Sequence, residues 1–422
     1  MALPVSATFD ANATMARAFP NIRLFEVTTG WASREQADFP PPYNKTTEVG
    51  GCGPYIQHSR LACNTWQAAV EPSIVGSASA VCFFTATHLA DALPAGTVFG
   101  LVHASYVGTD MQTWTPPEAI AQCAGVPPPP SPTPLPSYPP GGHPAIIPSG
   151  YSSLWNGMIH PIVGFGIRGV LWNQGEANMG WTEAVFACLF EAQIAAWRAR
   201  WGYDFFWGFV QLGTQPVPVW PSYLSGVRLG QSDALPGRSK TNRSAMAVAY
   251  DVGDHAGVHA RNKTVIGQRL ARALLHVEWG MDLPALDWAP PALASAVLGA
   301  DGAATFTFAT ASGAGVFLND TRDCWDCCAR GRDDVQLFAL AAGGVVREYV
   351  NTTLRLVSGT ELVATPVAPS KYGAFTGATF ARALWPQCAV FGVSNYEPLQ
   401  PFRVNLTAAA GAAQSAPAGR GP

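Results

Sequence analysis

The chain has 422 residues, of which 48% are apolar and 13% charged, and its formal net charge is −3. This length favours more than one domain, with enough apolar residues for a substantial core. The absence of a basic stripe argues against nucleic acid as a partner. No apolar run approaches the roughly 18 residues of a membrane span.

Strand-like and helix-like segments alternate in the first two thirds of the chain. Strands are predicted at 22–27, 99–104, 167–172, 205–212 and 245–250. Helices are predicted at 79–93, 153–163, 182–199 and 264–277. Segment 182–199 has the clearest apolar face, and Thr182 is a suitable N-cap. Alternating strands and helices predict an α/β domain whose parallel sheet is covered on both faces.

Composition shifts suggest the remaining organisation. Segment 126–148 is a proline-rich insertion, which we interpret as an extended passive loop rather than a ligand for an SH3- or WW-like module. From about residue 290, short alternating runs separated by Gly and Asn predict an antiparallel β domain. The expected domains are therefore 1–285 and 290–405, with a disordered tail over 406–422.

The nine cysteines and seven N-x-S/T sequons bear on the cellular compartment. Cys324 and Cys327 form a lone CxxC, followed directly by Cys328, and no second pair at zinc-site spacing accompanies them. We interpret these cysteines as disulfides or buried thiols, with a redox role as the alternative. Cysteines and sequons together favour a secretory route. The first residues, however, lack the basic start and continuous apolar core of a signal peptide.

Polar loops follow three of the predicted strands. Gln174 and Glu176 follow the strand at 167–172, and loops 105–110 and 251–259 follow two others. In a parallel sheet, ligands bind beyond the carboxyl ends of the strands. Topology alone therefore predicts a site where these loops converge.

Loop 251–259 offers a candidate general base, His259, because the pKa of histidine lies near neutrality. A carboxylate would orient the imidazole, and Asp254 or Asp251 is close enough in sequence. Two His and two Asp in this loop also suggest a metal site, but no further ligand cluster supports it, so no metal or other cofactor is predicted. A surface loop without chemistry is the alternative.

A second group of candidates is suited to stabilising negative charge. The Gln174 amide and the backbone N–H groups at Val107, Gly108 and Thr109 can donate to an oxyanion. Glu176 cannot donate when ionised, so we expect it to orient its neighbours. The structural alternative for Gln174 is a strand cap.

Several blocks resemble the sialate O-acetylesterase family, in family order over nearly the whole chain. LWNGMIHPIVGFGIRGVLWNQGEAN (154–178) resembles the family's tryptophan-glutamine-glycine-glutamate block. SASAVCFF, GLVHASYVGTDMQTWTP, MAVAYDVGD…VHARNK and the segment at 381–403 resemble further family blocks. The first block is specific, and the others are moderately so.

The resemblance implies an SGNH-type hydrolase with a flavodoxin-like three-layer α/β/α sheet. A serine would attack an acetyl ester, with His259 as base, Gln174 as oxyanion donor and Glu176 beside it. Two departures concern the site. Val107 replaces the first glycine of the family's turn, and Ala256 stands where such enzymes commonly carry the triad aspartate. This leaves Asp254, Asp251 or a Ser–His dyad.

The family's nucleophile motif, Gly-Gln-Ser-Asn, does not occur in this chain. Met1 aligns with the methionine that follows that motif in the family. We therefore expect that residues 1–285 lack the first strand, the catalytic serine and a signal peptide, as in an incomplete gene model. A serine-less natural protein is the alternative. The polypeptide as written is expected to be inactive, by about a millionfold in kcat.

The expected substrate is a small acetylated sugar or glycan, with acetylated sialic acid favoured and the protein secreted or lysosomal. Acetylxylan-type esterase chemistry is the second possibility. The third is a non-catalytic glycan-binding protein on the esterase fold.

Overall fold

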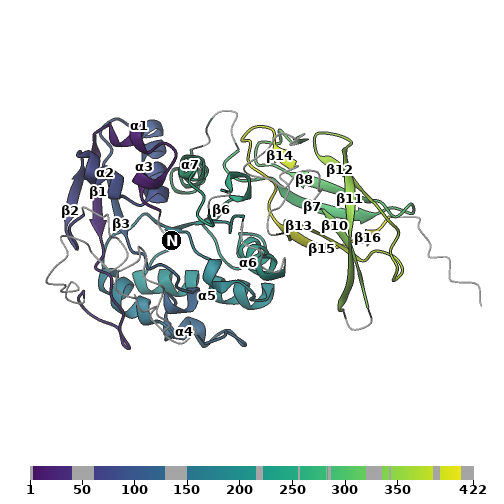
Figure 1. The fold of residues 1–422 in the computed structure, drawn as a ribbon, viewed down its shortest axis with the longest axis horizontal. Helices are drawn as coiled ribbons and strands as arrows, with labels where there is room; N and C mark the ends of the chain where they lie inside the picture. The colour runs from purple at the N-terminus through teal and green to yellow at the C-terminus, as the bar shows by residue number, and fades with distance from the viewer. Residues whose placement is uncertain are drawn as a thin grey trace, which may run out of the picture.

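The computed structural model describes residues 3–39, 61–128, 150–214, 222–254, 257–281, 283, 287–319, 335–341, 344–383 and 390–409. An N-terminal α/β part and a C-terminal antiparallel β part lie side by side (Figure 1). Most of the proline-rich insertion, the CxxC segment, His255 and Ala256 fall outside the described residues, so the interpretations made for them are not addressed.

Most of the predicted elements of the α/β part are present. The strands are β1 (Phe19–Glu26), β2 (Trp66–Ala69), β3 (Phe99–His103), β4 (Gly169–Trp172), β5 (Phe206–Val210) and β6 (Ser244–Ala247). The helices are α1 (Ala11–Met15), α2 (Pro72–Ser77), α3 (Ala80–Ala92), α4 (Pro117–Ile120), α5 (Glu183–Trp201), α6 (Ser222–Asp233) and α7 (Lys263–Trp279). The helix expected at 153–163 is a π-helical turn (Trp155–Ile159) followed by a 3-10 turn (His160–Ile162).

The strands form two three-stranded sheets instead of the single sheet expected from the alternation. One sheet has the order β2-β1-β3, and the other has the order β4-β5-β6. Pairing within the second sheet is parallel, as is β1 with β3, whereas β2 runs antiparallel to β1. Each sheet therefore ends in a strand paired on one side only, β3 in the first and β4 in the second.

The two sheets share their cores on both faces, so they behave as parts of one layer. On one face, Phe99 of β3 and Leu171 of β4 pack in the same cluster beneath α3 and α7. On the other face, Val102 of β3 and Val170 of β4 belong to the cluster that includes α5. This is the three-layer α/β/α arrangement that was expected, with helices above and below the strands (Figure 1).

Strands β3 and β4 are less buried than strands β5 and β6. β5 and β6 are buried at every position, whereas β3 is half-buried or exposed throughout and β4 is half-buried at three of its four positions. A strand in the middle of a parallel sheet normally pairs on both sides and is covered on both faces. β3 and β4 therefore each have an edge without a ladder partner among the described strands.

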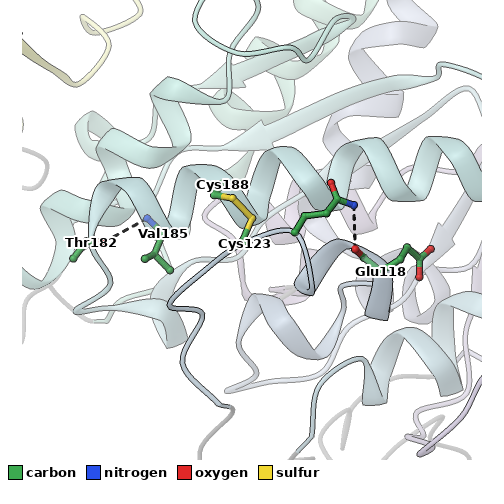
Figure 2. Close-up of a disulfide and its surroundings, with 6 residues drawn as sticks. Glu118, Cys123, Thr182, Val185 and Cys188 are labelled. Carbon is green, nitrogen blue, oxygen red and sulfur yellow. Dashed lines mark hydrogen bonds between the residues drawn. A yellow bond between two sulfur atoms is a disulfide. The ribbon is translucent and has the colours of Figure 1, made fainter.

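The first helix turn and a disulfide fix the position of α5. Thr182 caps the helix as predicted, because its side chain accepts a hydrogen bond from the backbone N–H of Val185 at 3.4 Å. Cys188 on the same helix forms a disulfide with Cys123, 65 residues earlier (Figure 2). The bond ties the loop after α4 to this layer of the domain.

The C-terminal part is the antiparallel β region expected from residue 290. Its eight-stranded sheet has the order β15-β13-β10-β11-β12-β8-β7-β16, and β9 pairs with β14. The bounds are β7 (Ala292–Leu298), β8 (Ala304–Ala309), β9 (Val316–Leu318), β10 (Gln336–Leu340), β11 (Val346–Leu356), β12 (Glu361–Pro366), β13 (Gly377–Phe380), β14 (Val390–Gly392), β15 (Phe402–Asn405) and β16 (Thr407–Ala408).

The expected disordered tail does not begin at residue 406. Thr407 and Ala408 pair in parallel with Val297 and Leu298 of β7, because this edge of the sheet is still open to a further strand. Residues 410–422 lie outside the described part. No helix among the described residues is both long and apolar enough to cross a bilayer.

Candidate active site

A cavity lies at the carboxyl ends of β4, β5 and β6, where the sequence places its polar loops. Gln174 and Glu176 line it from the loop after β4, and His259 and Lys263 line it from the segment that leads into α7. The other lining residues are Asn173, Val210, Gln211, Leu212, Gly213, Thr214, Ala249, Val258, Ala260 and Ile266. The structure thus brings together Gln174, Glu176 and His259, whereas loop 105–110, Asp251 and Asp254 do not line this cavity.

The turn that presents Gln174 and Glu176 depends on the glycine between them. Gly175 has φ = 154°, and a Cβ at this position would lie 3.1 Å from Cγ1 of Val227. A positive φ is rarely adopted by residues with a side chain. The Gln-Gly-Glu order therefore allows the chain to leave β4 and turn at once into the short 3-10 helix Glu176–Asn178.

The Gln174 side chain is held in a network of buried amides. Its Nε2 donates to the backbone oxygen of Thr109 at 3.2 Å and to Oδ1 of Asn178 at 2.6 Å. Asn178 also accepts from the N–H of Met111 at 2.9 Å and donates to Oε1 of Gln112 at 3.0 Å. A primary amide has two N–H groups, and both are used here. The Oε1 atom of Gln174 is buried without a hydrogen-bond partner among the described residues.

The turn at 107–109 joins this network through one of its three residues. Thr109 is buried, its hydroxyl donates to the backbone oxygen of Tyr106 at 2.7 Å, and it accepts from the indole N–H of Trp114 at 3.0 Å. Gly108 has φ = 71° and is exposed, while Val107 is half-buried. The structure places Thr109 beside Gln174, so the loops after β3 and β4 are linked at their polar ends.

His259 lies in a charged environment. Burial lowers its pKa below the ordinary value, Glu176 acts to raise it and Lys263 acts to lower it. The imidazole is therefore neutral near pH 7, which is the form that accepts a proton from a hydroxyl. Among the carboxylates, Glu176 is the one whose charge acts on His259.

The two aspartates considered as partners of His259 are paired with arginines. Asp251 forms a bidentate ion pair with Arg269, at 2.7 Å and 2.6 Å. Asp254 is likewise held by two nitrogens of Arg261, one of them at 3.2 Å. Neither ion pair involves His259, so a triad role for Asp251 or Asp254 stays a prediction that requires a change of partner.

The Asp251 pair belongs to the contact between the two parts of the molecule. Arg269 is 3% exposed and lies 3.9 Å from Glu397 of the C-terminal part. Glu397 in turn accepts a hydrogen bond from the N–H of Val248 at 3.0 Å. By holding Arg269 next to Glu397, Asp251 helps to join the two parts of the molecule.

Lys263 is the cavity residue that sequence reasoning missed. It is the first residue of α7 and only 5% exposed. Burial lowers its pKa to about 8, against an opposing effect of Glu176. A lysine at the first position of a long helix is unfavourable to the helix dipole, but the helix was expected to begin at residue 264, so the sequence did not draw attention to Lys263.

No cluster of three or more His, Cys, Asp or Glu side chains in the described part of the chain has the arrangement of a metal site. The groups that line the cavity have the following chemistry. A neutral imidazole can accept a proton, an ammonium can bind negative charge, and a carboxylate can orient both.

Comparison with known proteins identifies the fold class and distant relatives. The structure resembles a carbohydrate acetylesterase from Xanthomonas citri, with a TM-score of 0.70 and 22% sequence identity over 96% of this chain and 78% of that one. The fold is thus that of a carbohydrate acetylesterase, and no family model matches the chain.

Sequence comparison points in the same direction over part of the chain. About 47% of the chain is 30% identical to sialate O-acetylesterase of Rattus norvegicus, covering 43% of that protein. The human sialate O-acetylesterase is 32% identical over 47% of this chain and 40% of its own length. The chain therefore matches less than half the length of these relatives.

Proposed function

We propose that the protein is a carbohydrate acetylesterase that resembles sialate O-acetylesterase and uses His259 as its general base. The observation that carries this proposal is the meeting of His259, Gln174 and Glu176 in one cavity at the carboxyl ends of parallel strands. The similarity to acetylesterases in both sequence and fold supports it.

The proposed reaction needs a serine that residues 1–422 do not offer in the family's motif. We propose that it is carried by a strand that lies between β3 and β4. Each of these strands has one edge without a partner among the described strands, and both are largely half-buried, so an inserted strand would pair on both sides.

The start of the described chain is well placed for such a strand. The N–H of Ala80 donates to the backbone oxygen of Leu3 at 2.8 Å, and the N–H of Val5 donates to Ala78 at 2.9 Å. The N–H of Phe9 donates to the oxygen of Arg261, two residues after His259. A segment leading into Leu3 would therefore approach α3 close to the loop that holds the base.

In the proposed reaction, the serine oxygen attacks the acetyl carbon while His259 accepts the serine proton. His259 then returns the proton to the sugar oxygen as the ester bond breaks. Water attacks the acetyl-serine in the same way, and acetate leaves. Sequencing the 5′ end of the native transcript tests the origin of the serine, because a longer reading frame should read Gly-Gln-Ser-Asn directly before Met1.

The preferred substrate is proposed to be an acetylated sialic acid, with acetylated xylan as the alternative. An acetyl group is small and neutral, so the site residues around it do not separate the two. Rates of acetate release from 9-O-acetyl sialic acid and from acetylated xylan, measured side by side, decide between them. Equal or higher rates on xylan would contradict the sialic acid assignment.

A non-catalytic glycan-binding role is the remaining alternative. It predicts tight glycan binding by calorimetry without acetate release. If such binding is unchanged in His259→Ala and Gln174→Ala, the cavity takes no part in it. For the location, the Cys123–Cys188 disulfide supports a secreted or lysosomal protein, because disulfides persist in oxidising compartments.

A further inference from the structure

Lys263 is a buried cation whose ammonium has no hydrogen-bond partner among the described residues, although the charge of Glu176 acts on it. Its side chain lines the cavity, and its ammonium makes no hydrogen bond or ion pair with any described residue. With 5% of its surface exposed, it has lost most of its contact with water. An ammonium has three N–H donors, and leaving them unsatisfied in a protein interior is costly.

The surroundings of Lys263 favour a negative ligand. Lys263 opens the 17-residue helix α7, whose N-terminus adds a partial positive charge on the same side of the cavity. Glu176 lines the cavity too and helps to keep the lysine protonated, since it acts to raise a pKa that burial lowers to about 8. Lys263 is thus mainly charged at pH 7.

The Gln174 amide, which the sequence suggests as the oxyanion donor, already donates to other groups of the protein. Both N–H groups of the Gln174 amide are used by Thr109 and Asn178, so Gln174 has no free donor for a substrate in this arrangement. A negatively charged oxygen in the cavity needs another donor, because stabilising such charge is a large part of ester hydrolysis. Lys263 lines the same cavity as His259, and its ammonium makes no hydrogen bond to the described residues.

We propose that Lys263 is a further catalytic residue, whose ammonium binds the negatively charged oxygen of the acetyl group and the carboxylate of the acetate product. The interaction is a charge-assisted hydrogen bond, and no covalent bond to the lysine forms. The proposal rests on the proposed acetylesterase function, because it names the group that stabilises the charge formed in that reaction.

Acetate binding tests the proposal directly in the full 422-residue chain. Titration with ¹³C-labelled acetate, followed by NMR line broadening, should give a dissociation constant in the millimolar range for the unmodified chain. Lys263→Met should weaken binding by at least about tenfold, since a hydrogen bond to a charged group is lost. Lys263→Arg should retain most of it, and Lys240→Met, at an exposed lysine of the same domain, should bind as the unmodified chain does.

Unchanged acetate affinity in Lys263→Met, or no acetate binding by the unmodified chain, would overturn the proposal. Circular dichroism of each variant shows whether the fold is retained. If Lys263→Met fails to fold, Lys263→Gln, which also lacks the charge, takes its place, and unchanged acetate affinity in that variant would likewise overturn the proposal.

Ester hydrolysis separates failure of this inference from failure of the proposed function. In an acetylesterase with its serine in place, Lys263→Met should lower kcat by about a hundredfold to a thousandfold, with little change in KM. Equal kcat for both proteins would overturn the role of Lys263 and leave the esterase function intact. Acetate binding that depends on Lys263, without hydrolysis of any acetyl ester, would support the anion site and contradict the esterase function.

Discussion

Replacing Lys263 by methionine should stabilise the folded chain while it weakens acetate binding. Methionine is close to lysine in length and is apolar, so it fills the same buried space without a charge. The lysine costs stability because only 5% of its surface is exposed, and this burial disfavours the charged form of its ammonium.

The magnitude follows from the pKa of Lys263. Burial lowers it from 10.5 to about 8. Each pKa unit is worth about 1.4 kcal/mol, so burial of the protonated lysine costs on the order of 3 kcal/mol. Below pH 8 both folded and unfolded chains hold this proton and the full cost applies. Between about pH 8 and 10.5 the unfolded chain binds more protons, so stability rises with pH and the cost disappears.

Urea unfolding followed by tryptophan fluorescence measures the effect. Lys263→Met should gain on the order of 3 kcal/mol over the unmodified chain at pH 7, and the gap should narrow towards about pH 10. Lys240→Met is the matched control and should differ from the unmodified chain by less than about 0.5 kcal/mol. A Lys263→Met variant that is less stable at pH 7, or a gap that does not change with pH, would refute the reasoning.

Three further predictions concern other parts of the site and fold. In an NMR titration, the His259 imidazole should protonate at a lower pH than an exposed histidine, and Lys263→Met should raise its pKa; protonation at the ordinary value in both proteins would contradict the electrostatics. Asn178→Ala should lower the free energy of unfolding by about 3 kcal/mol, because it removes the acceptor of the Gln174 side-chain N–H and of the Met111 backbone N–H, and a loss below about 1 kcal/mol in urea unfolding would show that the amide network matters little. Cys123→Ser should lower the free energy of unfolding by about 2–4 kcal/mol, and reduction of the disulfide in the unmodified chain should have the same effect. No change in the melting temperature on reduction would contradict this prediction.

Local patterns in the sequence predicted individual elements well. Helix α5 follows its apolar spacing and begins at the cap expected from Thr182, and α7 begins one residue before the expected position 264. Each of these features depends on residues within a few turns of each other, which is the range over which periodicity and capping act.

Strand pairing and the partners of charged groups depend on contacts far apart in the chain. The alternation of strands and helices does not tell whether β3 and β4 pair, and they do not. Likewise, closeness in sequence suggested Asp254 and Asp251 as partners of His259, but both are bound to arginines on or before α7. An arginine offers several donors in a fork that fits a carboxylate better than an imidazole does.

Two features of the site had no clear sequence pattern. Gln174 was expected to offer its amide to a substrate, but its donors are taken by groups that arrive from the loop after β3 and from Asn178. Lys263 stands out only because it is buried, and burial of a long charged side chain is decided by packing in three dimensions.

Restoring a serine-bearing strand tests the central claim most directly. A strand of about six residues followed by Ser-Gly-Gln-Ser-Asn is fused before Met1 and compared with the same fusion carrying alanine instead of the second serine. We predict that the serine fusion releases acetate from an acetylated sugar, that the alanine fusion does not, and that His259→Gln abolishes the release. A folded serine fusion with no more acetate release than its alanine counterpart would contradict the account.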